Sequence, residues 1–85
     1  MKLAHLAKLV GMSQYYFCHL FKRSMGVTPY QYVLQQRIER SKQLLKQNEL
    51  SIAEIALMCG FKNQSHLTTF FRKLTGITPK VFRSP

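Results

Sequence analysis

The chain is short and strongly basic. Its 85 residues include 13 Lys and Arg against 3 Asp and Glu, a formal net charge of +10, and 46% of them are hydrophobic. This hydrophobic content excludes a disordered chain and suffices for one small domain, or for two very small ones that share a long element. The charge favours a polyanionic partner. Nucleic acid is favoured over a membrane, because no apolar run approaches the ~20 residues that span a bilayer.

The cysteines, histidines and acidic residues form no recognisable catalytic or metal-binding pattern. Cys18 and Cys59 lack the paired spacing of a zinc site, and His5, His19 and His66 do not complete one. Without a recognisable signal peptide, we expect two reduced thiols in a cytoplasm. Cys18 and His19 are adjacent, so their side chains diverge around a helix, and three isolated glutamates cannot build a metal-ion nuclease site. We therefore expect no enzyme, no metal and no cofactor.

The first 27 residues predict two short helices joined at a glycine. Helical spacing predicts a helix from residue 2 to about residue 10, with an inward face formed by Leu3, Leu6, Ala7 and Val10. Gly11 permits the left-handed conformation that ends a helix. Ser13 is a candidate N-cap for a second helix, which runs to about Met25 and is stopped by Gly26. Its buried stripe is expected to be Phe17, Leu20 and Phe21.

A long helix is predicted next. Thr28 is the candidate cap, Pro29 suits the first helical position, and Gln31 completes a capping box. Nothing breaks the helix before about Lys46, so about eighteen residues give a rod of roughly 27 Å. Its apolar sides are expected to be Tyr30, Val33, Leu34, Ile38, Leu44 and Leu45. A loop over residues 47–50 follows.

The last third of the chain predicts a second pair of helices. Ser51 and Glu54 form another capping box, and Gly60 makes the turn. Asn63 caps the following helix, which runs to about Thr75, is ended by Gly76 and turns inward Leu67, Phe70 and Phe71. A final short turn begins at Thr78-Pro79 and contains Val81 and Phe82.

Two segments of the chain repeat. The pattern Leu3-Ala4-x-Leu6-Ala7-x-x-x-Gly11 recurs 49 residues later as Ile52-Ala53-x-Ile55-Ala56-x-x-x-Gly60, and Gly26-Val27-Thr28-Pro29 recurs 50 residues later as Gly76-Ile77-Thr78-Pro79. An alanine four residues before each turn glycine is the small side chain needed where two helices cross at a sharp angle. Each copy therefore predicts a helix-turn-helix unit, whose second helix enters the major groove of DNA. We expect an all-α fold with a first unit over 1–27, a linker helix and loop over 28–50, and a second unit over 51–85.

The chain resembles the AraC/XylS family of bacterial transcription regulators. The resemblance rests on Ser51-Ile52-Ala53-Glu54-Ile55-Ala56, Cys59-Gly60-Phe61, Gln64-Ser65-His66-Leu67, Phe70-Phe71-Arg72-Lys73, Gly76-Ile77-Thr78-Pro79 and Phe82-Arg83. It extends to Arg37-Ile38-Glu39-Arg40-Ser41 and to the first unit, so it covers nearly the whole chain. The family implies a bipartite domain whose two units enter successive major grooves on one face of double-stranded DNA. The expected rod plus its connections is close to one duplex turn of ~34 Å.

The resemblance also sets expectations about the whole protein. We expect a sequence-specific regulator, an activator that also touches RNA polymerase. Family domains carry a further helix before the first unit, and many members carry a ligand-binding or oligomerisation domain. We therefore expect Met1 to be an engineered start and the chain to be a monomeric fragment of a larger regulator. Whether the full-length regulator is a dimer is left open. A DNA-targeting module of a transposase or recombinase, which also uses tandem units, is the alternative.

The expected base contacts lie on one face of each second helix. In the first unit they are Gln14, Tyr15, Cys18 and His19, and the resemblance places positions 15, 18 and 19 at base-contacting positions of the family. In the second unit they are Gln64, Ser65, Thr68 and Thr69. Glutamine can hold adenine through two hydrogen bonds, and serine and threonine can serve several bases. His66 lies one step round the helix, where packing or a phosphate contact is favoured. An ordinary solvated face is the alternative for both helices.

The expected phosphate contacts are of two kinds. Ser13 and Asn63 cap helices whose free N–H groups and positive dipole ends attract phosphate. The cationic candidates are Lys22, Arg40 and Arg72. For Arg37 and Lys42 on the linker helix, the sequence does not decide between a phosphate contact and a solvent-exposed position.

Overall fold

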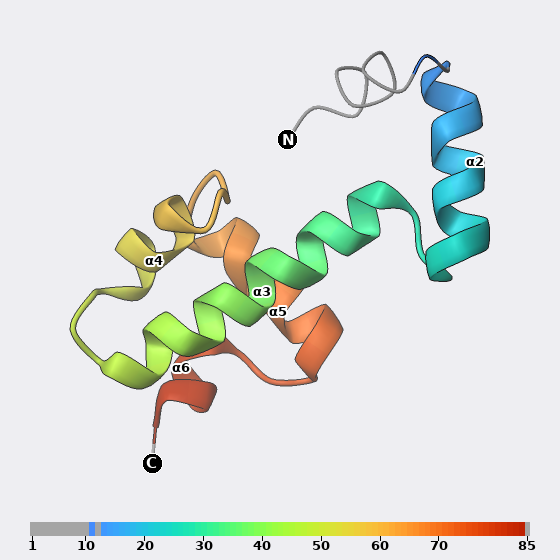
Figure 1. Ribbon diagram of the computed structural model, residues 1–85. Helices are drawn as coiled ribbons and strands as arrows, with labels where there is room; N and C mark the ends of the chain where they lie inside the picture. Colours follow the sequence, from blue (N-terminus) through green and yellow to red (C-terminus); the bar gives the residue numbers. More distant parts are fainter. Residues whose placement is uncertain (1–10, 12, 85) are drawn as a thin grey trace. The chain divides into compact units, whose positions relative to one another are not determined.

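The computed structural model describes residue 11 and residues 13–84, and every regular element among them is a helix. In chain order the helices are α2 (Gln14–Met25), α3 (Pro29–Gln47), α4 (Ile52–Met58), α5 (Gln64–Thr75) and α6 (Pro79–Arg83) (Figure 1). The expected all-α fold class is confirmed. The helix predicted over residues 2–10 lies outside the described residues. The chain divides within α3 into two compact units, residues 1–33 and 34–85.

In the first unit, α2 begins and ends where the sequence predicts. The Ser13 hydroxyl accepts a hydrogen bond from the Tyr16 N–H at 3.1 Å, and Gly26 ends the helix in the left-handed region with φ 81°. The expected stripe is only half-buried, at Phe17, Leu20 and Phe21. The residues expected to cover it belong to the segment 2–10, outside the described part of the chain.

The corner that leads from α2 into α3 recurs between α5 and α6. At the first corner Thr28 and Gln31 exchange backbone–side-chain hydrogen bonds of 3.0 and 3.1 Å, and Pro29 takes the first helical position. At the second corner the Thr78 hydroxyl accepts from the Val81 N–H at 3.2 Å, again with a proline at the start of the helix. The capping prediction for Thr28 is confirmed, and the segment predicted as a final short turn from Thr78-Pro79 is the short helix α6.

Aromatic packing at the two corners is repeated as well. Phe21 and Tyr32 meet edge-on with ring centroids 5.7 Å apart and an interplanar angle of 68°. Phe71 and Phe82, each 50 residues further along, meet at 5.5 Å with the same angle of 68°. The sequence repeat is therefore a repeat of packing geometry.

The linker helix α3 has 19 residues. In the second unit its inward stripe follows helical spacing and consists of Leu34, Ile38, Ser41 and Leu45. Ser41 is fully buried, and its hydroxyl donates to the Ile38 carbonyl at 2.7 Å, so the buried polar group is satisfied. The expectation for Tyr30 is wrong: it is 57% exposed, whereas Pro29 is buried and the half-buried Tyr32 packs against Phe21. Among the described helices, none is long and apolar enough to cross a membrane.

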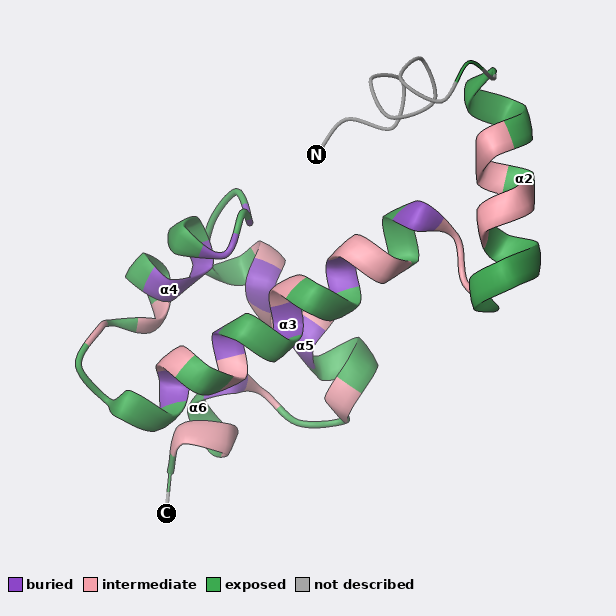
Figure 2. Cartoon of the chain, viewed as in Figure 1, coloured by how far each residue is buried: buried purple, intermediate pink, exposed green. Residues whose placement is uncertain are grey.

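The core of the second unit lies where α3, α4 and α5 meet (Figure 2). Its buried hydrophobic residues are Leu34, Ile38, Leu45, Ile55, Ala56, Cys59, Phe61, Leu67 and Phe71. Phe70, expected to point inward with Leu67 and Phe71, packs against this core but is only half-buried.

The turn between α4 and α5 is closed by backbone hydrogen bonds. Gly60 has φ 90°, and its N–H donates to the Leu57 carbonyl at 3.2 Å, while the Phe61 N–H donates to the Ala56 carbonyl at 2.9 Å. This pair of bonds is the Schellman arrangement that ends many helices at a glycine. At the other end of α4, Ser51 and Glu54 form the expected capping box. Ala56 is fully buried, which agrees with the need for a small residue where α4 crosses its neighbours.

Candidate nucleic-acid interface

The entry into α5 is held by a short series of side-chain contacts. The Asn63 side chain accepts from the His66 N–H at 2.8 Å, which confirms Asn63 as the N-cap. His66 returns a contact, because its Nδ1 accepts the Lys62 N–H at 3.1 Å. The imidazole also lies edge-on between Phe61 and Phe70, with ring centroids 5.3 and 5.1 Å away. His66 is therefore a packing residue at the start of α5, as its position one step round the helix predicts.

The predicted base-contacting residues of α5 lie together. Gln64, Ser65, Thr68 and Thr69 line one shallow, open hollow on the surface. Gln64, Ser65 and Thr69 are exposed and Thr68 is half-buried, whereas Leu67 and Phe71 on the opposite side are fully buried. The helix thus has one face locked into the core and one polar face turned outward.

The Thr69 hydroxyl differs from expectation. It donates to the Ser65 carbonyl at 2.9 Å, one turn back along α5. A hydroxyl has one proton, so Thr69 offers a base its acceptor lone pairs and its methyl group but no free donor.

The predicted face of α2 is also turned outward. Gln14, His19 and Lys22 are exposed and Tyr15 is 83% exposed, while Cys18 is half-buried.

The thiols of Cys18 and Cys59 are both free. Burial raises the pKa of the Cys59 thiol, and the positive charge of Arg40 opposes part of that rise.

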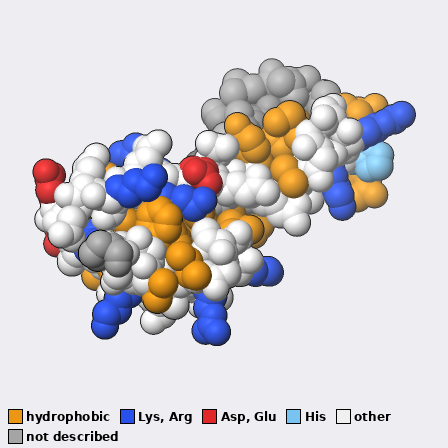
Figure 3. Space-filling view, turned by 90° about the horizontal axis from the view of Figure 1, so that it is seen from below, with side chains coloured by type: hydrophobic (Ala, Val, Ile, Leu, Met, Phe, Trp, Pro, Cys, Tyr) orange, Lys and Arg blue, Asp and Glu red, His pale blue; other side chains and the backbone are white. Residues whose placement is uncertain are grey.

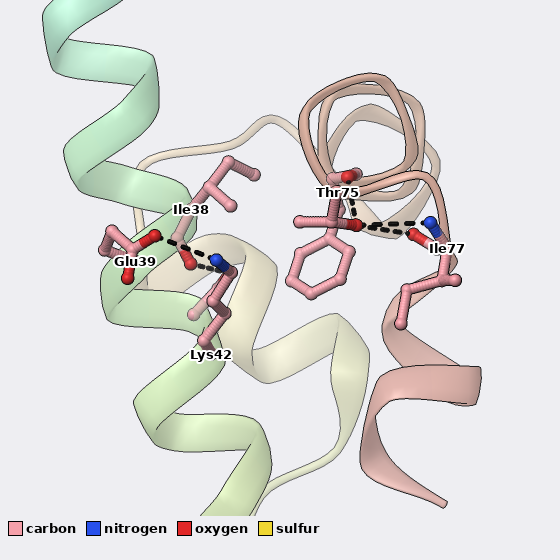
Figure 4. A network of polar contacts seen from close by, with 7 residues as sticks. Ile38, Glu39, Lys42, Thr75 and Ile77 are labelled. Atoms are coloured by element: carbon pink, nitrogen blue, oxygen red, sulfur yellow. Dashed lines mark hydrogen bonds and ion pairs between the residues drawn. The ribbon is translucent and has the colours of Figure 1, made fainter.

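The basic residues of α3 differ in what they contact. Lys42 pairs with Glu39 at 2.8 Å, beside the C-terminal turn of α5 where Thr75 bonds to Phe71 and Ile77 (Figure 4). Arg37 donates from Nη1 to the Gly60 carbonyl at 3.2 Å. Both residues are therefore occupied by contacts within the second unit, whereas Arg40 and, on α5, Arg72 are exposed. Figure 3 shows Lys and Arg side chains around the rim of this unit, with a hydrophobic area between them.

Comparison with known proteins agrees with this geometry. A family of helix-turn-helix domains matches residues 6–84. The chain is 40% identical over 76 residues to the probable transcriptional regulator LumQ of Photobacterium leiognathi and 41% identical over 64 residues to the HTH-type transcriptional activator RhaR of Cronobacter sakazakii. The match to LumQ includes 89% of this chain and 31% of LumQ, and the match to RhaR includes 75% of this chain and 23% of RhaR. The chain therefore spans less than a third of the length of each of these two relatives.

Solved structures give the type of domain. A Chromobacterium violaceum regulator with an AraC-type DNA-binding domain is 36% identical, with a TM-score of 0.87 over 98% of this chain and 74% of that one. The chain is an AraC-type helix-turn-helix domain. A further match is the DNA-binding domain of AdpA, a global transcriptional factor, in complex with a target DNA, which is 30% identical with a TM-score of 0.88 over 98% of this chain and 75% of that one. The family resemblance drawn from the sequence is confirmed. Because the relatives are named as transcription regulators, the transposase or recombinase alternative is not favoured for this AraC-type domain.

Proposed function

We propose that this domain reads double-stranded DNA sequence-specifically within a bacterial transcription regulator, with α5 in one major groove and α2 in a successive one. The observation that carries the proposal is the polar face of α5, formed by Gln64, Ser65, Thr68 and Thr69. The opposite face is anchored by Leu67 and Phe71, both fully buried. A recognition surface on a helix anchored in this way is held more sharply than one on a loop.

The side chains of α5 suit particular base edges. Gln64 lies in the first turn and can accept and donate together, which matches the N6 and N7 of adenine. Ser65 can donate to or accept from several bases. Thr69 has its proton bonded to Ser65, so its methyl group suits the methyl of thymine better than a base acceptor. This face therefore favours sites rich in A·T pairs.

The face of α2 has a different chemistry. Tyr15 is 83% exposed and suits a thymine methyl or a sugar. His19 can donate to guanine N7 or O6 or to a phosphate, and Gln14 can hydrogen-bond a base at the start of the helix. Cys18 is half-buried and offers at most an apolar edge. We infer that α2 discriminates fewer bases than α5.

Phosphate contacts would hold both helices in register. The side chains of Ser13 and Asn63 accept hydrogen bonds within their own helices, so phosphates would meet the neighbouring backbone N–H groups at these positive helix ends. The exposed cations Lys22, Arg40 and Arg72 would neutralise further phosphates. A protein that uses such contacts binds more weakly as salt rises, because bound counterions are released from DNA.

The remaining expectations concern the whole regulator. We infer that it acts in the cytoplasm as an activator that touches RNA polymerase, and that this domain binds DNA as a monomer. RhaR, one of its relatives, is named as a transcriptional activator.

Selection of binding sites from random DNA with this chain tests the proposal. We expect two short motifs separated by about one helical turn of ~10.5 base pairs, one for each unit. If about six phosphates are neutralised, log K should fall against log salt with a slope near −5. Enrichment of no motif, together with a slope near zero, would contradict DNA as the partner. A single ungapped motif would contradict the use of both units.

A further inference from the structure

A guanidinium from α3 covers the turn of the second helix-turn-helix unit. Arg37 is half-buried and donates from Nη1 to the Gly60 carbonyl at 3.2 Å. A Cβ placed on Gly60 would lie 2.9 Å from the Arg37 Nε and 3.0 Å from its Cζ. The guanidinium therefore lies directly against the backbone of the turn. Glycine suits position 60 because of its φ of 90°, and the absence of a Cβ lets the guanidinium approach this closely.

The Arg37 charge is satisfied by this carbonyl and not by an acid. The salt bridge among the described residues joins Lys42 to Glu39, one turn further along α3. A hydrogen bond from a charged donor is stronger than one between neutral groups. Among the described residues, the bond from Arg37 to the Gly60 carbonyl is also the side-chain hydrogen bond that links α3 to the turn before α5.

From Gly60 the constraint passes into the recognition helix through consecutive contacts. Only Phe61 and Lys62 separate Gly60 from the N-cap Asn63. Phe61 is buried and its N–H is bonded to α4, the Lys62 N–H is bonded to His66, and the His66 N–H is bonded to Asn63. No residue between the turn and the first turn of α5 is left without a partner, so a shift of Gly60 would displace the start of α5.

We propose that Arg37 is a positioning residue for DNA reading. By holding the Gly60 carbonyl it sets the angle at which α5 leaves the turn, and with it the placement of Gln64 and Ser65 against base edges. The inference rests on the proposed DNA binding and adds to it a residue that acts from behind the interface. A phosphate contact by the same arginine is a different role, which the test below separates from positioning.

The two roles predict different losses. Base readout needs side chains held within ~0.5 Å of the productive geometry, whereas non-specific binding depends on charge. A positioning residue should therefore matter for the cognate site and hardly at all for random DNA. A phosphate contact should matter equally for both and should lower the salt slope by about one.

The experiment compares Arg37→Met with Lys46→Met, which removes one exposed charge from the same helix. Dissociation constants are measured by fluorescence anisotropy on the selected site and on a random duplex across a salt series. We expect Arg37→Met to weaken the cognate site by about fivefold relative to Lys46→Met, because binding must then impose the turn geometry that this one hydrogen bond holds in the free protein. Random-DNA affinity and salt slope should match those of the control. Arg37→Gln, which keeps a polar group of shorter reach, is the second variant if Arg37→Met does not fold.

A second measurement needs no DNA. In the free protein, amide hydrogen exchange at Lys62 and His66 should be faster in Arg37→Met than in Lys46→Met, while the exchange of Leu67 in the core stays the same. Equal weakening on cognate and random DNA, unchanged affinity, or unchanged exchange at both amides would each overturn the positioning role. If the wild-type chain selects no site, the proposed DNA reading fails, and the exchange comparison still decides whether Arg37 holds the turn.

Discussion

Replacing Gly60 by alanine perturbs two physical effects at one position. The first is backbone strain, because φ is 90° and a left-handed residue with a side chain costs about 1–2 kcal/mol. The second is the contact with Arg37, whose Nε would lie 2.9 Å from the new methyl group. The guanidinium would have to move, and its hydrogen bond to the Gly60 carbonyl would be lost at a cost of about 1 kcal/mol, since the bond is partly solvated. We expect Gly60→Ala to lower the free energy of unfolding by about 2–3 kcal/mol.

Gly76 provides the matched control in the same unit. It also ends a helix in the left-handed region, with φ 84°, but a Cβ there would meet no atom within 4 Å. Gly76→Ala should therefore cost only the strain, about 1–2 kcal/mol. The difference of about 1 kcal/mol between the two variants isolates the Arg37 contact.

Urea unfolding followed by far-ultraviolet circular dichroism measures both losses. In an Arg37→Met background the excess cost of Gly60→Ala over Gly76→Ala should shrink toward zero, because the clash and the hydrogen bond are both gone. Equal costs for the two glycines in the wild-type background would show that Arg37 moves aside freely. Negligible costs at both positions would refute the left-handed turns themselves.

The remaining predictions concern recognition and the thiols. Gln64→Ala should weaken the selected site by about 1–3 kcal/mol and relax preference at one base pair, whereas Arg72→Ala should weaken all sequences alike; equal losses on cognate and random DNA would remove Gln64 from base reading. Scrambling the half-site of the second unit should reduce affinity, measured by anisotropy, more than scrambling that of the first, and the reverse order would overturn this ranking. Cys59, whose thiol pKa is raised by burial, should react with a thiol reagent far more slowly than Cys18. Because the folded Cys59 thiol keeps its proton at a higher pH than the unfolded one, wild type should lose stability relative to Cys59→Ala above the ordinary thiol pKa of 9.0, and parallel pH profiles would contradict this.

The ends of the helices could be predicted from the sequence because each depends on residues three or four positions apart. The hydroxyls of Ser13 and Ser51 and the amide of Asn63 each accept from an N–H three residues further on. Gly26 and Gly76 end their helices because glycine reaches the left-handed region without strain. Because the segment Gly-x-Thr-Pro is repeated, both corners have a threonine cap followed by a proline at the first helical position.

The polar face of α5 could also be predicted, but the availability of its groups could not. The spacing of Gln64, Ser65, Thr68 and Thr69 places them on one side of any helix, and the structure gathers them in one hollow. Whether the Thr69 proton is free depends on a side-chain rotamer that bonds it to Ser65. The sequence does allow this bond to be anticipated, because a threonine hydroxyl within a helix often donates to the carbonyl four residues back.

The contacts of the charged residues of α3 are determined by the tertiary structure alone. Arg37, Arg40 and Lys42 have similar sequence surroundings, yet Arg37 lies on the turn, Lys42 pairs with Glu39, and Arg40 is exposed. The Arg37 contact joins residues 23 positions apart, and no periodicity within α3 indicates which backbone carbonyl will pack against it. Tyr30 was misplaced for the same reason: its spacing fits the apolar stripe, but the elements packed around it determine which side of α3 is covered. Local hydrogen bonds and helical periodicity therefore determined the elements and their faces. The partner of each long side chain was set by the packing of helices distant in sequence.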